Sequence, residues 1–193
     1  MNPLLPASAQ SDLVLASRSP RRGDLMRGLG FEFRTEVSAY LEDSFPGEAP
    51  EAMVRRHALG KAREVAGRLD SGLVIGADTI VVCDEPLGKP ADADEARAML
   101  TAVALLQAAG GGSVCALGRT RVDFRELDPG EINAYISSGE AFDKAGAYGI
   151  QGLAAAFVTG IDGCYFNVMG LPLELLCRLL RAFANGDDLA PPG

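Results

Sequence analysis

Apolar residues in the first half of the chain follow two different spacings. Continuous apolar runs at 13–16 and 73–83 predict strands that are buried on both faces. Alternation of apolar and polar residues over 31–37 predicts a further strand. Pro20 and Gly30 mark the start and stop of a predicted helix over 20–29. Apolar residues at steps of three and four predict an amphipathic helix over 54–69. Strands therefore alternate with helices in this half.

The second half is richer in predicted strands. The apolar stretch 99–118 is ambiguous, because it fits either the continuation of a helix or the start of a strand. A polar segment, GIDGCY at 160–165, predicts a turn. Helices are predicted to begin at Asp92, with Glu95 completing a capping box, and at Asp128, and to cover 171–183; strands are predicted over 122–127 and 153–159.

This order of elements predicts an α/β fold with a mixed, twisted sheet flanked by helices. The 193 residues suffice for one compact domain with a substantial core. We expect that domain to cover 13–184, between a flexible N-terminal segment, 1–12, and a flexible proline-rich tail, 185–193.

Composition narrows the class of protein. A net charge of -8 argues against broad nucleic-acid binding, which requires a basic surface. No apolar run approaches the roughly 20 residues that cross a bilayer, and the first residues do not resemble a secretory signal. We therefore expect a cytoplasmic protein with neither a nucleic-acid nor a membrane partner. The four cysteines form no C-x-x-C pair and are expected to be free thiols.

Asp78 is a charged residue inside the most apolar predicted strand. A buried carboxylate is costly unless it is paired, hydrogen-bonded or bound to a metal. Gly76 leaves room for a close approach by a ligand, and Thr79 adds a hydroxyl. Two interpretations stay open with similar weight: a metal ligand or general base, or a buried ion pair with an arginine or lysine.

The loop SRSPRR at 17–22 joins a predicted strand to a predicted helix, so backbone N–H groups and the helix dipole face an incoming anion. Ser17 and Ser19 supply hydroxyls, while Arg21 and Arg22 supply planar cationic groups suited to phosphate. A solvated basic helix start is the alternative. Two positive charges in a first turn oppose the dipole, however, which favours a phosphate-binding role.

For the other candidate residues, the sequence alone gives weaker evidence of a functional role. Lys61 lies on a predicted helix, while Lys89 and Lys144 lie in tight loops that can hold an ammonium group in place. Glu42 is typical of a surface charge. The single histidine, His57, is expected to be a surface or half-buried helix residue, so we exclude histidine-based metal clusters. A metal would then depend on carboxylates, which favours Mg²⁺ or Mn²⁺ over zinc.

Taken together, these segments resemble the Maf family of nucleotide pyrophosphatases over nearly the whole chain. The resemblance implies a mixed α/β fold, similar to inosine triphosphatase, with a central cleft between two lobes, and often a homodimer. It also implies hydrolysis of a nucleoside triphosphate to a monophosphate and pyrophosphate. The motifs, in family order, are LASRSPRR at 15–22, KA at 61–62, GADTIVV at 76–82, LGKP at 87–90, SGEAFDKAGAYGIQG at 138–152 and NVMGLPL at 167–173.

The resemblance also assigns roles to individual residues. Asp78 matches the catalytic proton acceptor and, with Glu42, would hold a divalent cation, Mg²⁺ or Mn²⁺. Arg21, Thr79 and Gln151 match positions that affect substrate choice. The forms SPRR, DTIVV and GIQG resemble the branch that acts on dTTP and UTP in nucleotide-pool cleaning. The remaining substrate-binding residues that match the polar cleft, or lie in its loop, are Ser17, Ser19, Arg22, Lys61, Lys89 and Lys144.

One departure from the family pattern stands out. Family members carry an LSG-x-x-H segment before the strand that begins TAVAL, but here Leu100 runs directly into Thr101. The connection is shorter by about ten residues, although such junctions need a few residues at least. Two alternatives to the dTTP/UTP activity stay open: 7-methyl-GTP hydrolysis, and a non-catalytic nucleotide-binding regulator linked to septum formation. The missing segment favours the regulator, whereas intact Asp78, Lys89 and Gln151 oppose it.

Overall fold

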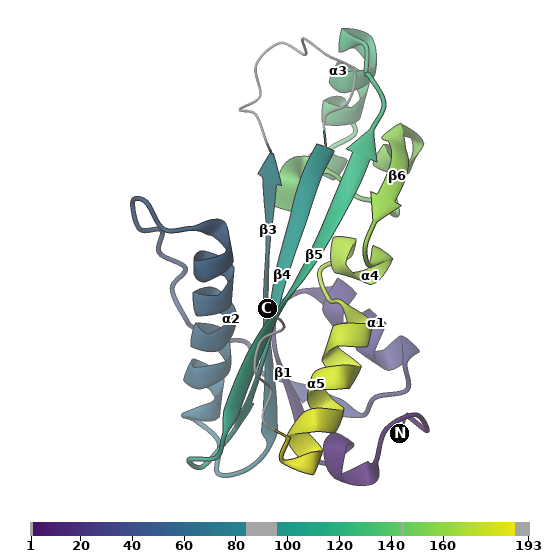
Figure 1. The fold of residues 1–193 in the computed structure, drawn as a ribbon. Coiled ribbons are helices and arrows are strands. Elements are labelled where there is room, and N and C mark those ends of the chain that lie inside the picture. Colours follow the sequence, from purple (N-terminus) through teal and green to yellow (C-terminus); the bar gives the residue numbers. More distant parts are fainter. Residues whose placement is uncertain (1, 84–95, 144, 188–193) are drawn as a thin grey trace.

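A computed structural model describes residues 2–83, 96–143 and 145–187 of the chain. Within these residues one sheet of six strands forms the centre of the molecule, with helices on both of its faces (Figure 1). The strands are β1 (Leu13–Ala16), β2 (Phe33–Thr35), β3 (Leu73–Cys83), β4 (Ala96–Gln107), β5 (Ser113–Phe124) and β6 (Val158–Asp162). The helices are α1 (Pro20–Gly28), α2 (Pro50–Ala66), α3 (Pro129–Ser137), α4 (Tyr165–Val168) and α5 (Leu173–Asn185), with 3₁₀ turns η1 (Ala7–Gln10), η2 (Glu140–Asp143), η3 (Ala145–Ala147) and η4 (Leu153–Phe157).

The sheet is mixed, which confirms the predicted α/β fold class. Its strand order is β2-β1-β3-β4-β5-β6, in which β1 pairs in parallel with β2 and β3. Strands β3 to β6 pair antiparallel with their neighbours. The pairing of β1 with β3 ends at Ala16 and Gly76, the last residues that face each other across the two strands. From Ala77 onward, β3 therefore has no strand neighbour on that side among the described residues.

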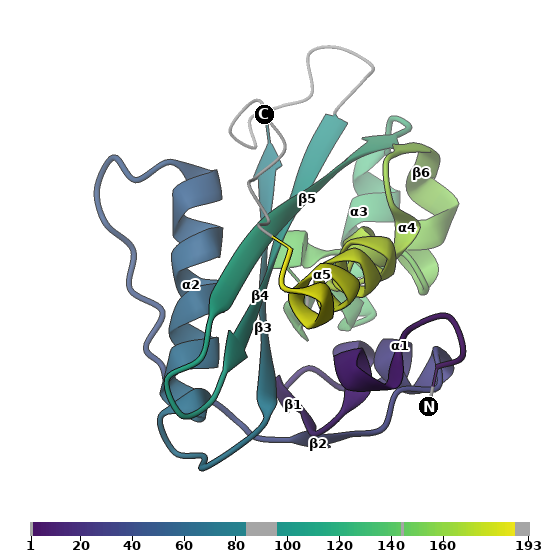
Figure 2. The same ribbon diagram turned by 60° about the horizontal axis from the view of Figure 1, so that its bottom comes forward.

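The two faces of the sheet belong to separate apolar clusters. Successive side chains of a strand point to opposite faces. Ile75 and Leu105 pack in the cluster that contains α1 and α5, while Val74 and Ala104 pack in the cluster that contains α2. Figures 1 and 2 show α2 on one side of the sheet and α5 on the other. The same alternation places Asp78, four residues after Val74, on the face covered by α2.

Helix α2 approaches the sheet closely because Gly76 has no side chain. A Cβ atom at Gly76 would lie 2.3 Å from the carbonyl oxygen of Ala58 and 2.9 Å from the Cβ of Ala62. Both alanines are fully buried, as the three- and four-residue spacing predicts. This approach brings the next polar residues of α2, His57 and Lys61, close to β3.

The helix predicted to begin at Asp92 does not continue into the ambiguous stretch 99–118. Residues 96–107 form β4, which pairs with β3 from Arg97 to Gln107 and with β5 from Ala96 to Leu106. Hydrogen bonds on both sides of a central strand outweigh its local helical propensity. The ambiguous stretch is therefore a hairpin of two strands, with its turn at 108–112. The predicted helix start at Asp92 and Glu95 lies outside the described residues.

The predicted strand over 153–159 is also wrong in its first part. Residues Leu153–Phe157 form η4, and β6 begins only at Val158. Strand β6 continues to Asp162, inside the segment that was predicted to be a turn. Its pairing with β5 includes a register irregularity at Asp123 and Phe124. Contacts with β5, rather than the apolar run itself, therefore set the limits of this strand.

The start of the chain, expected to be flexible, makes contacts with the rest of the molecule. Leu5 and Ala9 are buried in the cluster that contains α5, and η1 lies against that helix. The Gln10 side chain donates hydrogen bonds to the backbone oxygens of Asn2 and Leu5. The limits 13–184 of the domain stay a prediction, and the tail is described only to residue 187. No described helix is long and apolar enough to pass through a lipid bilayer.

Candidate functional site

A cleft of about 370 Å³ follows the edge of β3 beyond the end of β1. Asp78 and Thr79 line it from the strand, and Arg21 lines it from the start of α1. Gln151 lines it from the loop before η4. The sequence predicted functional roles for all four residues, and the fold brings them to one cavity from three distant segments.

Asp78 is buried and accepts a short hydrogen bond from a lysine. Its side chain is 9% exposed, and Lys61 Nζ lies 2.6 Å from Asp78 Oδ1. The same ammonium group lies 2.8 Å from Glu42 Oε1. Lys61 therefore joins the two carboxylates that were predicted as metal ligands. The two interpretations of Asp78 combine, because the residue forms a buried ion pair and also lines a cleft.

The electrostatic surroundings of Glu42 favour its charged form. Partial burial alone would raise the pKa of Glu42, but the hydrogen bond from Lys61 and the nearby positive charges lower it below its usual value. The side chain is still 52% exposed. Glu42 is thus an ionised group that solutes can reach, rather than the isolated surface charge that the sequence suggested.

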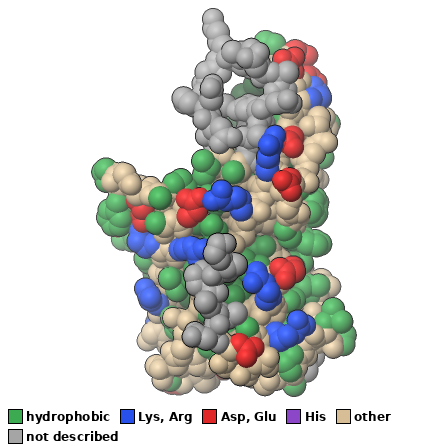
Figure 3. All heavy atoms as spheres, in the orientation of Figure 1, with side chains coloured by type: hydrophobic (Ala, Val, Ile, Leu, Met, Phe, Trp, Pro, Cys, Tyr) green, Lys and Arg blue, Asp and Glu red, His purple; other side chains and the backbone are tan. Residues whose placement is uncertain are grey.

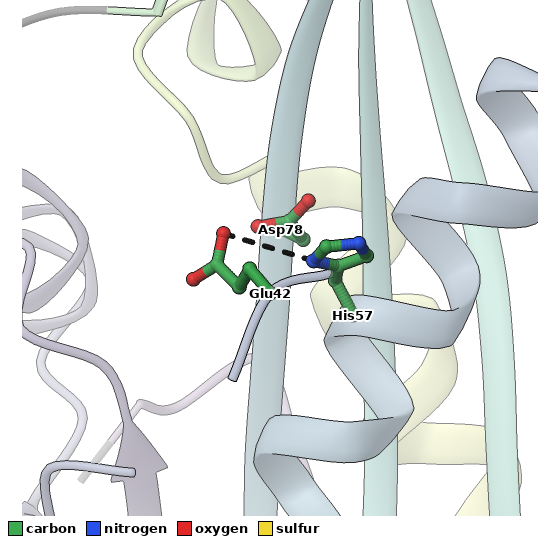
Figure 4. A group of neighbouring side chains, drawn as sticks. All are labelled: Glu42, His57 and Asp78. Carbon is green, nitrogen blue, oxygen red and sulfur yellow. Dashed lines mark ion pairs between the residues drawn. The ribbon is translucent and has the colours of Figure 1, made fainter. Parts of the chain in front are cut away.

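The prediction that His57 is a surface or half-buried residue is wrong. Its side chain is 5% exposed, and the ring of Tyr40 packs edge-on against it at 5.8 Å. The imidazole Nδ1 lies 3.7 Å from Glu42 Oε2, and single ligand atoms of Glu42, His57 and Asp78 all lie within 4.8 Å of one another (Figure 4). The loop before α2 folds back over the helix and covers a histidine that local sequence could not place.

The guanidinium of Arg22 forms its hydrogen bonds within the protein and so stabilises the loop 17–22. Its guanidinium donates to the backbone oxygens of Gly170 and Ala77, each at 2.8 Å, and to the hydroxyls of Thr79 and Ser17 at 3.0 and 3.3 Å. Burial lowers the pKa of Arg22, and Asp78 and Glu42 oppose that shift; an arginine stays protonated regardless. These bonds tie the start of α1 to β3 and to the loop before α5.

A second cavity of about 340 Å³ lies on the other side of the same loop. Ser19 and Arg22 line both cavities, while Ser17, Glu42 and Lys61 line only the second. Ser17 Oγ also accepts a hydrogen bond from the backbone N–H of Ser19. The predicted loop therefore lies between the cavity that contains Asp78 and the cavity that contains Glu42. Two further predicted residues, Lys89 and Lys144, lie outside the described residues.

A family model described as "Maf-like protein" matches residues 12–183. The chain belongs to the Maf family. A dTTP/UTP pyrophosphatase of Syntrophomonas wolfei is 48% identical to it over 178 residues, which cover 86% of this chain and 94% of the relative. A dTTP/UTP pyrophosphatase of Pelotomaculum thermopropionicum is 47% identical over 184 residues, with 89% and 96% covered.

The alignment with the Syntrophomonas relative also shows that this chain is shorter than the relative within the matched region. The alignment with the Syntrophomonas relative is 178 residues long, yet it covers only 86% of the 193 residues of this Maf-family chain. Some aligned positions of that relative therefore have no counterpart here. Residues 96–100 pair as part of β4 in the described structure.

Glu140 of this Maf-family chain also lines the cleft and was not predicted individually. Its carboxylate accepts hydrogen bonds from the backbone N–H of Leu153 and from the hydroxyl of Tyr135, so it holds the loop that carries Gln151. A Cβ at Gly152 would collide with this carboxylate. The sequence motif at 138–152 includes this residue, but only its tertiary contacts show that it positions the loop of the cleft.

The face of the molecule seen in Figure 3 carries Lys and Arg side chains among Asp and Glu side chains, without an extended surface of one sign. Positive charge relevant to an anionic ligand is instead local, at the start of α1 and at Lys61. This distribution suits a small anion that enters a cleft.

Proposed function

We propose that this chain is a nucleoside triphosphate pyrophosphatase that hydrolyses dTTP and UTP to the monophosphate and pyrophosphate. The observation that carries the proposal is Asp78, which is held by Lys61 inside a cleft that also contains Arg21, Thr79 and Gln151. The names of the Maf relatives, at 47–48% identity over most of both chains, supply the substrates.

The phosphates bind at the loop 17–22 in this proposal. A triphosphate carries about four negative charges, which fixed cationic donors must offset. Arg21 lines the cleft, and the N-terminus of α1 adds backbone N–H groups and a favourable dipole. The four hydrogen bonds of Arg22 keep this loop in place before the substrate arrives, so little ordering is needed on binding.

Asp78 acts as the general base. Asp78 Oδ1 accepts from Lys61, and Oδ2 has no hydrogen-bond partner among the described residues. Water attacks the α-phosphorus, its proton passes to Asp78, and the bond between the α-phosphorus and the bridging oxygen breaks. Pyrophosphate leaves with the bridging oxygen. The hydrogen bond from Lys61 orients the carboxylate of Asp78 for this step.

A divalent cation would complete this site. Glu42 and Asp78 would hold it, and their oxygens lie close enough to share one ion with His57. When bound, the cation neutralises charge on the phosphate oxygens. The buried nitrogens of His57, which have no hydrogen-bond partner among the described residues, lie beside these carboxylates and fit a role as a further ligand.

Pyrophosphate release from a panel of dTTP, UTP and 7-methyl-GTP, with Mg²⁺ and with Mn²⁺, tests the proposal. We expect dTTP and UTP to be hydrolysed fastest, and Asp78→Asn to lower kcat by about 10²–10⁴-fold. Preferred hydrolysis of 7-methyl-GTP would refute the substrate assignment. Nucleotide binding without pyrophosphate release would favour the regulator, and near-full turnover of Asp78→Asn would refute the role of Asp78.

The homodimer and the cytoplasmic location stay predictions. Light scattering on the eluate of a size-exclusion column measures the mass directly, and a mass near twice the 20.2 kDa of one chain is expected.

A further inference from the structure

His57 is a buried polar side chain that makes no hydrogen bond within the described protein. Neither Nδ1 nor Nε2 has a hydrogen-bond partner among the described residues, and the side chain is 5% exposed. Burial of a donor and an acceptor without partners destabilises the folded state. An apolar residue at this position would complete the stripe of α2 without that penalty, so the imidazole calls for a ligand.

The imidazole faces a carboxylate at a distance that suits a shared ion. Nδ1 lies 3.7 Å from Glu42 Oε2, which is too long for a hydrogen bond. Two atoms that each bind one ion at about 2.1 Å lie at most about 4.2 Å apart, so this gap suits an intervening cation. Asp78 contributes a third ligand atom, and the three atoms lie within 4.8 Å of one another, so a small side-chain rotation brings all three to one ion. Figure 4 shows the three side chains converging from β3, α2 and the preceding loop.

Lys61 does not fill this gap. Its ammonium group binds Glu42 Oε1 at 2.8 Å and Asp78 Oδ1 at 2.6 Å, whereas His57 faces the other oxygen of Glu42. Lys61 can therefore orient both carboxylates from one side while an ion binds from the other. Such outer hydrogen bonds commonly orient the ligands of metal sites.

We propose that Glu42, His57 and Asp78 form one metal site, in which His57 makes the site prefer a first-row transition-metal ion, Mn²⁺ or Co²⁺, over Mg²⁺. Carboxylates alone suit Mg²⁺ and Mn²⁺, but a neutral imidazole nitrogen adds affinity mainly for transition metals. The inference deepens the proposed function, since it assigns a third ligand and a metal preference to the same site.

The test measures metal binding without nucleotide. Calorimetric titration with MnCl₂, CoCl₂ and MgCl₂, and the visible absorption of bound Co²⁺, are recorded for the wild type and for His57→Leu. We expect His57→Leu to weaken Mn²⁺ and Co²⁺ binding by about 10-fold or more and to change the Co²⁺ spectrum, with little effect on Mg²⁺. Glu131→Gln, which removes a carboxylate from an exposed ion pair with Arg125, is the matched control and keeps wild-type binding.

A second readout guards against a folding defect. Without metal, His57→Leu should melt at the same temperature as the wild type or higher, because the unpaired imidazole is gone. Added Mn²⁺ should then raise the melting temperature of the wild type more than that of the variant. If His57→Leu fails to fold, His57→Gln replaces it.

Equal Mn²⁺ affinity of the wild type and the His57 variant, or equal loss for Mn²⁺ and Mg²⁺, would overturn the proposal. Metal binding that depends on His57 in a protein that releases no pyrophosphate would leave this site standing and refute the enzymatic function instead.

Discussion

Helices α2 and α5 cover opposite faces of one sheet with different side chains. Helix α5 presents large apolar residues, and Leu176 and Leu180 among them are fully buried. Helix α2 presents Ala58 and Ala62, and the next positions around the helix carry His57 and Lys61. The α5 face is a packed core, whereas the α2 face approaches closely enough to bring polar groups to Asp78 on the strand.

The difference shows that small buried residues on a helix can also bring the polar side chains of that helix into a functional site. With large side chains on α2, the helix would stand farther from β3, and Lys61 would not reach Asp78 at 2.6 Å. We therefore expect changes on α2 to alter activity together with stability, and changes on α5 to alter stability alone.

The largest effect should come from Lys61→Met on the α2 face. Loss of the ammonium leaves Glu42 and Asp78 without their shared cation, so we expect kcat to fall by about 10²–10³-fold. Stability should fall too, by up to about 3–5 kcal/mol for the buried half of the network. Pyrophosphate release and urea unfolding measure the two effects. Lys61→Arg, which keeps the charge, should recover part of each; no recovery would show that charge is not what matters here.

Leu176→Ala on the α5 face should affect only stability. Removal of a fully buried leucine side chain leaves a cavity and costs about 2–5 kcal/mol. Urea unfolding measures that loss, and kcat per folded molecule should stay at the wild-type value. A fall in kcat comparable to that of Lys61→Met would contradict the division between the two faces.

Gly76→Ala should separate α2 from β3. The new methyl would collide with the carbonyl oxygen of Ala58, at 2.3 Å, so we expect a loss of about 1–3 kcal/mol and a lower kcat. Thermal melts and pyrophosphate release are compared with those of Gly28→Ala, whose added methyl meets nothing within 4 Å. If both variants keep full activity, catalysis does not depend on the close approach of α2 to β3.

The smallest effect concerns pH. Because Lys61 lowers the folded pKa of Glu42 below its unfolded value, the ionised side chain stabilises the protein at neutral pH, and this contribution disappears as pH falls through the folded pKa. Since Glu42 is half exposed, it amounts to less than about 1 kcal/mol. Metal-free unfolding of the wild type and Glu42→Gln at pH 7 and near pH 3 should show a difference that shrinks at the lower pH. A stability difference that grows on acidification would mean that folding raises, rather than lowers, the pKa of Glu42.

Local sequence was sufficient to predict those helices and strands that bury a regular row of apolar side chains. The spacing in α2 and α5 and the apolar run of β3 predicted these elements correctly, because each pattern corresponds to one buried face. The loop 17–22 and Asp78 were also identified as candidate site residues, since a charge in an apolar strand and two arginines at a helix start are unusual by themselves.

Only the tertiary structure decided the rest. Residues 96–100 form a strand because β3 and β5 supply hydrogen bonds on both sides, and local periodicity cannot report partners that are distant in the sequence. His57 is buried because the loop that carries Tyr40 and Glu42 folds back onto α2. The chain by itself determined which residues are chemically unusual; the packing of α2 on Gly76 determined that Lys61 and His57 meet Asp78, because that contact depends on the separation of two elements rather than on the sequence of either.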